Sequence, residues 1–471
     1  MKAISFFLFF LIFSISICAS GLCASDAIKT AEEEKTDLTN LKILDLKTAG
    51  KIALEKNPSF EAAFMRVQQA KEMLNQARAT YWPRLDASAS FSHTTLSQNA
   101  YNTNLAYAKL LNPSATIDDP ENYYNTGIRA TWILFNGFER YYYNQAARFG
   151  KKQSEFAKDD MKRLLLSSVV EIYFSAQLAL ESIKISEADK TFNQKLYEEA
   201  KARSRQGAGS LSDEMNFEIR VIAAELKLLK AKKLFRASMF GLAAVLGMPN
   251  AIFPESLTLS NLQSETDEEL EPVNIQDLIN FALLNRSDIM QSESLLNAAM
   301  AEVKMKRAKF YPSVGLSAAY EGTRTNDMAF ENDDFGNSAG VNVTYNLFSG
   351  GSDRARLGEA ISRQKEVTKM LEALRLDVIS DVRTSVETLL LAQKELVLLR
   401  SSAVLVKKNR DLVEMEYAAG QSSLVRLNEA QRDMITAQSR LALSLVTLRK
   451  AWFDLEATIG KISERYDEWQ G

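Results

Sequence analysis

Side chains that could carry out covalent or metal chemistry are scarce in this chain. His93 is the only histidine, and the two cysteines, Cys18 and Cys23, both lie in an apolar N-terminal segment. A histidine-based metal site needs several nitrogen or sulfur ligands, and a nucleophilic serine or cysteine needs a base beside it. We therefore expect no catalytic residues, no metal site and no cofactor, and we expect His93 to be an ordinary strand side chain.

Two further patterns could support chemistry, but both have simpler explanations. Carboxylates are plentiful, yet charged residues make up 25% of the chain and fit the solvated faces of helices. The pair Gly350-Gly351 opens a helical pattern as a phosphate-binding loop would, but the lysine of a Walker loop is missing. The sequence thus predicts a protein that is not an enzyme.

The N-terminus is typical of a secretory signal peptide. Lys2 is followed by an apolar run rich in phenylalanine and then by small residues, which places the expected cleavage after Ala24. Ile17 and Leu22 stand directly before the two cysteines, where a lipoprotein signal has a small residue, so lipid anchoring is disfavoured. Cleavage would leave a mature chain without any thiol.

The charge balance of the mature chain excludes one class of partner. Removal of the signal leaves 56 basic and 60 acidic residues, a formal net charge of −4. A chain this close to neutrality is not typical of a nucleic-acid-binding protein. No second apolar run of about 20 residues follows the signal, so no membrane-spanning helix is predicted.

Two long segments of the chain are copies of each other. Residues 137–207 and 350–420 each begin and end with glycine, contain no proline, and are related by a shift of 213 positions. A continuous helix of this length would be roughly 100 Å long at ~1.5 Å per residue. Apolar residues recur at spacings of three and four, as on one helix face. The stripe of the first copy is Met161, Leu165, Val169, Ile172, Ala176, Leu180 and Ile183.

Each copy ends in a turn sequence that is followed by a second helical pattern. The turns are Gly-Ala-Gly-Ser at 207–210 and Gly-Gln-Ser-Ser at 420–423. Gly207 and Gly420 suit the end of a helix, and Ser210 and Ser423 suit the start of the next one. We therefore predict that each long helix turns back here into an antiparallel partner.

Segments of alternating apolar and polar residues precede each long helix. Four strands are predicted, at residues 85–92, 128–134, 314–320 and 339–348. One side of the fourth suits lipid, although a strand of a soluble sandwich alternates in the same way. Four strands leave two unpaired edges, which lipid does not tolerate, so neighbouring chains have to close the sheet. The lipid-facing side of the fourth strand consists of Val341, Val343, Tyr345 and Leu347.

These elements give a duplicated layout. It comprises a signal peptide at 1–24, a polar tail at 25–40, a helix–strand–strand–helix repeat at 41–249, an acidic linker at 250–272, a second repeat at 273–460 and a C-terminal tail at 461–471. A helix break is expected near Pro58. The linker has no basic residue and is interpreted as a solvated connector, and residues 97–122 are interpreted as a loop between strands.

The order and duplication of these motifs resemble the TolC family of outer-membrane export channels. The motifs that carry this resemblance are Tyr-Trp-Pro and Phe-Tyr-Pro before the strands and Leu-Phe-Asn-Gly and Leu-Phe-Ser-Gly after them, in two halves that follow a signal peptide. The resemblance implies an α+β membrane protein and a homotrimer with a twelve-stranded transmembrane β-barrel and a periplasmic α-barrel. It also implies a tripartite efflux pump or type I secretion system, with a periplasmic adaptor and an inner-membrane pump as partners.

The same resemblance implies where the periplasmic end closes. Tyr417 and Asp213 fit the family pattern, whereas Ser422 stands where an arginine is expected and Arg426 replaces a pore carboxylate. Arg426 is expected to reach Asp213 or Glu429, or else to form only a surface pair with Glu429. The hairpin tips, with Gly207, Ser210, Gly420 and Ser423, are implied to meet the adaptor. The implied gate consists of Ser212, Asp213, Tyr417, Ser422, Arg426 and Glu429.

Two other functions remain open at this point. An exported structural coiled coil that tethers the envelope without a pore would explain the helices and the signal, but it has no use for four symmetrically placed strands. A passive porin would spend most of its length on strands. The predicted location is the outer membrane, with an extension into the periplasm.

Overall fold

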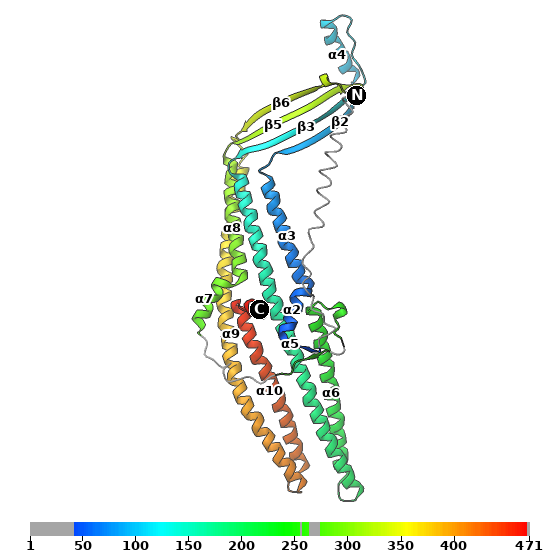
Figure 1. The fold of residues 1–471 in the computed structure, drawn as a ribbon, viewed down its shortest axis with the longest axis vertical. Coiled ribbons are helices and arrows are strands. Elements are labelled where there is room, and N and C mark those ends of the chain that lie inside the picture. Colours follow the sequence, from blue (N-terminus) through cyan, green and yellow to red (C-terminus); the bar gives the residue numbers. More distant parts are fainter. Residues whose placement is uncertain (1–41, 255–256, 263–273, 469–471) are drawn as a thin grey trace.

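The computed structural model describes residues 42–254, 257–262 and 274–468. The predicted signal peptide, the polar tail and part of the acidic linker lie outside these residues. Figure 1 shows an elongated molecule with a curved sheet near one end and helical hairpins that reach to the other. The chain therefore has no single compact core.

The two predicted long helices are present and match in length. Helix α5 covers Glu139–Arg205 and α9 covers Ser352–Ala418, with 67 residues each. Gly207 and Gly420, which follow them, have φ values of 74° and 75°. Because residues that carry a side chain rarely adopt this left-handed backbone conformation, glycine is favoured at the end of both helices.

The shorter helices repeat in the same order. Helix α6 (Leu211–Val245) returns along α5, and α10 (Leu424–Ile459) returns along α9. The remaining helices are α2 (Leu46–Lys56), α3 (Pro58–Ala79), α7 (Ile275–Asn285), α8 (Ser287–Arg307) and α11 (Ile462–Glu468). The predicted break at Pro58 is confirmed, since Asn57 ends α2 and its side chain caps α3.

The four predicted strands form one antiparallel sheet. They are β2 (Arg84–Thr94), β3 (Glu121–Asn136), β5 (Ser313–Thr325) and β6 (Phe335–Thr344), in the order β2-β3-β5-β6. The two halves of the chain meet where β3 pairs with β5. Strands β2 and β6 are the two edges of the sheet, and each has one side without a strand partner within the described chain.

The structure corrects two predicted boundaries in this region. Helix α4 (Gln98–Leu111) lies within the segment predicted to be a loop, with Ser97 capping its first turn. Strand β6 ends at Thr344, so Tyr345 and Leu347 follow the strand instead of belonging to it. The strand ends there because Thr344 is paired with Ser313, the first residue of β5.

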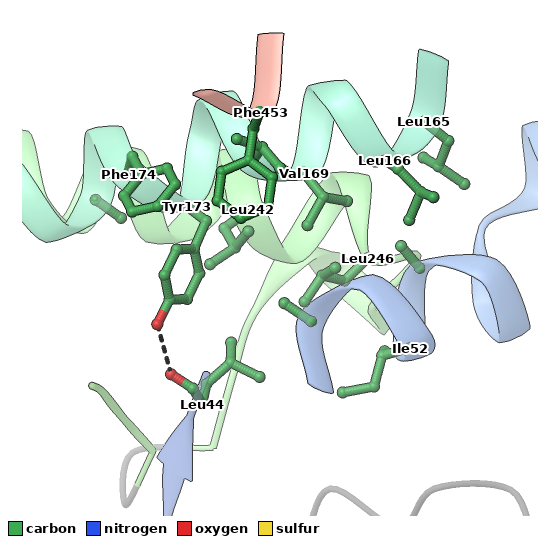
Figure 2. Packing of buried hydrophobic residues seen from close by; sticks show 14 of the residues in the cluster. Leu44, Ile52, Leu165, Leu166, Val169, Tyr173, Phe174, Leu242, Leu246 and Phe453 are labelled. Atoms are coloured by element: carbon green, nitrogen blue, oxygen red, sulfur yellow. Dashed lines mark hydrogen bonds between the residues drawn. The ribbon is translucent and has the colours of Figure 1, made fainter. Parts of the chain in front are cut away.

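The acidic linker is more than a solvated connector. Its strand β4 (Thr258–Leu259) pairs in parallel with β1 (Ile43–Leu44), and Leu257 and Leu259 are buried. In Figure 2 the Tyr173 hydroxyl donates to the Leu44 carbonyl at 3.1 Å. The connector therefore helps to cover an apolar core midway along the helices.

That core is built mainly from α5 and its neighbours. Tyr173 and Phe174 pack with Leu242 of α6 and Phe453 of α10, as Figure 2 shows. Among the described residues, only α5 contains a stretch long and apolar enough to cross a membrane, and half of that stretch is buried inside the molecule. Burial against other helices accounts for this composition.

Candidate functional site

The two hairpin tips have the same local construction. In the first tip the Gly207 N–H donates to the Ser204 carbonyl at 3.0 Å, and the Ser210 hydroxyl accepts from the backbone of Ser212. In the second, the Gly420 N–H donates to the Tyr417 carbonyl and the Ser423 hydroxyl caps α10. These bonds satisfy backbone groups that helix ends would otherwise leave unpaired. All four predicted contact residues, Gly207, Ser210, Gly420 and Ser423, are exposed.

An apolar cluster joins the two hairpins just behind the tips. Phe217 and Leu427 are almost completely buried in it, and the Tyr417 side chain packs against it. Burial raises the pKa of the Tyr417 hydroxyl, and the negative charge of Asp213 on the other hairpin adds to the shift. The structure thus brings together Tyr417 and Asp213, two of the residues predicted for the gate.

The predicted arginine makes a different contact from those expected. Arg426 Nη1 lies 3.6 Å from Glu416 Oε2, so within this chain it pairs with neither Asp213 nor Glu429. The tight turn after α9 places the last turn of α9 beside the first turn of α10, which makes Glu416 the nearer carboxylate. Both side chains are exposed, so the pair contributes under about 1 kcal/mol.

The other three predicted gate side chains lie in different surroundings. Ser212 is exposed in the first turn of α6. Glu429 is exposed on α10. The Ser422 hydroxyl is buried and has no hydrogen-bond partner among the described residues.

A buried polar group between the hairpins was missed by the sequence reasoning. Asp189 of α5 is 4% exposed and accepts from Gln431 Nε2 of α10 at 3.1 Å and from Asn193 Nδ2 at 3.0 Å. Lys227 Nζ of α6 lies 3.6 Å from its other oxygen. Three helices are therefore tied to one carboxylate. The available signal was that Asp189 and Asn193 sit on the same helix face as Leu196 and Ala200, where apolar residues are expected.

The register of the sheet gives it one apolar and one polar face. Residues opposite each other in neighbouring strands share a face. Trp132 lies opposite Leu316, which lies opposite Val341, and Val343 lies opposite Val314. Val341 and Val343 are 65% and 64% exposed, so the described residues leave this part of the face uncovered. It includes Leu85, Ala87, Ala89, Phe91, Ile128, Ala130, Trp132, Val314, Leu316, Ala318, Tyr320, Ala339, Val341 and Val343.

The opposite face of the same strands is polar. Asp86 lies opposite Arg129, and Arg129 Nη2 is 2.7 Å from Glu321 Oε1 on β5. Ser317 and Asn342 are on this face as well. An apolar outer band with a polar inner surface is the pattern of a transmembrane β-barrel.

The family profile described as outer membrane efflux protein matches residues 50–248 and 278–461, which is most of the chain. The chain belongs to this family. The match confirms the TolC-like interpretation and the duplication of the helix–strand–strand–helix unit. This efflux protein is accordingly an outer-membrane channel with a periplasmic extension, and it is not an enzyme.

Similarity to individual proteins extends over nearly the whole efflux protein. It is 23% identical to the alkaline protease secretion protein AprF of Pseudomonas aeruginosa, over 86% of this chain and 85% of AprF. It is 24% identical to the pyoverdine export outer membrane protein OpmQ of the same species, over 89% of this chain and 84% of OpmQ. The crystal structure of the Campylobacter jejuni CmeC outer membrane channel superposes with a TM-score of 0.76 at 17% identity, covering 90% of this chain and 88% of CmeC.

The family assignment also decides between the functions that the sequence left open. A pore-free envelope tether does not have this fold, and a porin does not have its long hairpins. Among the described residues, no group of three or more His, Cys, Asp and Glu side chains is placed to hold a metal ion. His93 lies in β2, where its Nδ1 is 2.8 Å from Asn122 Oδ1 of β3.

Proposed function

We propose that three copies of this chain close one barrel and one tunnel, which together form the outer-membrane component of a tripartite efflux pump or a type I secretion system. The observation that supports the trimer most strongly is the two-faced sheet with free edges at β2 and β6. An open sheet cannot stay in lipid, because its unpaired backbone groups have no water to bond. Pairing β2 of one copy with β6 of the next removes both edges.

The tips are the proposed contact with a periplasmic adaptor, which is itself bound to an inner-membrane pump. They are exposed, they lie at the end of the molecule away from the sheet, and both are built in the same way. The relatives' names indicate cargo of different kinds, a protease for AprF and pyoverdine for OpmQ. We therefore propose export of small molecules or proteins without assigning one cargo.

The proposed gate is formed by Ser212, Asp213, Tyr417, Ser422, Arg426 and Glu429 at the tips. The contact of Tyr417 with the apolar cluster and its proximity to Asp213 support a role in holding the two hairpins together. The Arg426–Glu416 pair joins α10 to α9 within the second hairpin. Opening would require the adaptor and pump to separate the hairpins of neighbouring copies.

Disulfide crosslinking between the edge strands tests the trimer. The predicted mature chain has no cysteine, so two introduced cysteines, such as Ser90→Cys on β2 and Ser338→Cys on β6, would be its only thiols. Further pairs that use Ser88, Ser92 and Asn342 sample the other possible registers between β2 of one copy and β6 of the next. We expect at least one pair to give a covalent ladder that stops at three chains, while each single variant gives none. A protein that keeps its strands but never crosslinks, or whose ladder continues past three, would rule out this assembly.

A further inference from the structure

A cavity of about 570 Å³ lies between α3 and α5, in the part of the helical body nearest the sheet. Its lining is strongly basic. Arg78 comes from α3, and Arg148, Lys151 and Lys152 come from α5, against a single acid, Glu155. Neither the hairpin tips nor the proposed gate includes any of these residues.

Most of this positive charge is not neutralised by the residues that the structure describes. Lys151 Nζ pairs with Glu155 Oε1 at 2.8 Å, which uses the only acid in the lining. Arg78, Arg148 and Lys152 form no ion pair with any carboxylate of the described residues. Several cations that line one concave surface raise the local concentration of anions.

The duplication shows that the helix pair does not need all of these cations. Helices α8 and α9 are the second copy of α3 and α5, with shifts of 229 and 213 positions. There Ile361 occupies the position of Arg148, and Gln364 that of Lys151. Arg307 and Lys365 keep the positive charges of Arg78 and Lys152. The same packing therefore forms without Arg148 and Lys151, so the presence of these two cations in the first copy calls for another reason.

The aromatic end of the cavity lies next to the strands. Tyr81, at the end of α3, and Tyr141, in the first turn of α5, line this end. The Arg140 guanidinium lies 5.1 Å from the centre of the Tyr81 ring and donates to the Leu134 carbonyl at 2.8 Å, which fixes this wall to the end of β3. This end of the cavity thus lies beside the junction between the sheet and the helices.

We propose that this cavity binds a phosphate-bearing anion at the periplasmic boundary of the membrane, either a phospholipid headgroup or a soluble phosphate compound. Arginine binds phosphate through two parallel hydrogen bonds and lysine binds it as a point charge. Arg78 and Arg148 supply the first kind of contact and Lys152 the second. The tyrosines provide apolar walls with a polar hydroxyl for the remainder of the ligand.

Native mass spectrometry of the intact assembly in detergent tests the proposal with two probes, phosphatidylglycerol and pyrophosphate. The test variant is Arg148→Ala with Lys152→Ala. The matched control is Arg307→Ala with Lys365→Ala, which removes two cations at positions of the second copy that correspond to Arg78 and Lys152. Phosphatidylcholine, which carries the same phosphate but no net charge, measures non-specific lipid retention.

We expect the wild-type protein to bind at least one probe above the phosphatidylcholine background. Its affinity should fall at least tenfold in the test variant and less than twofold in the control. Retention of phosphatidylglycerol alone assigns the site to a lipid headgroup, and binding of pyrophosphate alone assigns it to a soluble anion. Competition between the two probes shows that both bind this one site, and the probe with the higher affinity then identifies the source. The proposal is overturned if neither probe binds, or if test and control variants lose affinity equally. The same spectra report whether each variant still assembles.

Discussion

At the scale of single residues, the buried Asp189 carboxylate connects the two hairpins. Its bonds to Asn193 and Gln431 and its proximity to Lys227 connect α5 with α6 and α10. A buried carboxylate keeps its charge only when partners replace the water it has lost. Its position therefore ties the relative placement of the two hairpins to one side chain.

Removing that carboxylate should loosen the hairpins. Asp189→Ala leaves the buried amides of Gln431 and Asn193 short of one acceptor, which we expect to cost about 1–3 kcal/mol. Asp189→Asn retains an acceptor and should cost less. Asp159→Ala is the control, because the Asp159 side chain is 47% exposed and pairs with the adjacent Lys158 on the surface of α5. Thermal unfolding of the purified proteins should rank them in this order, and equal stability of Asp189→Ala and Asp159→Ala would contradict it.

At the scale of elements, glycine determines where the long helices end. Gly207 and Gly420 have left-handed φ values, yet a Cβ at either position would meet nothing within 4 Å. A substitution there strains the backbone by about 1–3 kcal/mol without disturbing any packing. The effect of such a change should therefore stay local to the tip.

Bulky residues at these glycines should separate assembly from export. We expect Gly207→Val and Gly420→Val to abolish export while the trimer still forms, because the proposed adaptor contact is altered and the sheet is not. Gly150→Ala inside α5, where a Cβ also meets nothing within 4 Å, is the control and should export normally. An export assay, normalised to the amount of trimer recovered from the same cells, measures export and assembly together. Normal export by both valine variants would refute the contact.

Long-range patterns in the sequence predicted these elements better than local ones did. The shift of 213 positions and the terminal glycines located α5 and α9, since a proline-free apolar stripe admits few alternatives to helix. Helix α4 was missed because turn residues surround it and none of its residues is buried. The β1–β4 pair was missed because each strand has only two residues and the pairing spans the whole first repeat.

The site residues were harder to predict for a related reason. Asp189 is one of 60 acidic residues, and only its burial between hairpins distinguishes it. The Arg426–Glu416 contact depends on the geometry of the turn, which spacing along a single helix does not describe. Sequence patterns within one helix or strand could be predicted from residue spacing, whereas contacts between elements are visible only in the folded structure.

At the scale of the whole molecule, insertion into the outer membrane depends on which face of the sheet meets lipid. Val341 and Asn342 are neighbours on β6 and point to opposite faces. Val341→Lys places a charge on the apolar face, at a cost of up to about 2–4 kcal/mol near the centre of a bilayer. Asn342→Lys places the same charge on the polar face and should be tolerated.

The proposed trimer should run as a heat-modifiable band in gels of outer-membrane fractions, and the amount of this band reports the difference. We expect the band to be depleted for Val341→Lys and retained for Asn342→Lys. The reverse result would mean that the apolar face is turned away from lipid. Val343 should behave as Val341 does, while Tyr345 and Leu347, which follow the strand, test whether the lipid boundary extends beyond Thr344.

The central claim is that this efflux protein is a tunnel closed at its tips, and single-channel conductance in planar bilayers tests it most directly. Arg426→Ala with Tyr417→Phe removes the Glu416 ion pair and the tyrosine hydroxyl near Asp213. We expect the double variant to conduct several times more than the wild type. Glu429→Ala should weaken the preference for cations. The control Arg363→Ala, which lies on α9 far from the tips, should change neither the conductance nor the ion selectivity. Unchanged conductance and selectivity in the tip variants would contradict a gate at these residues.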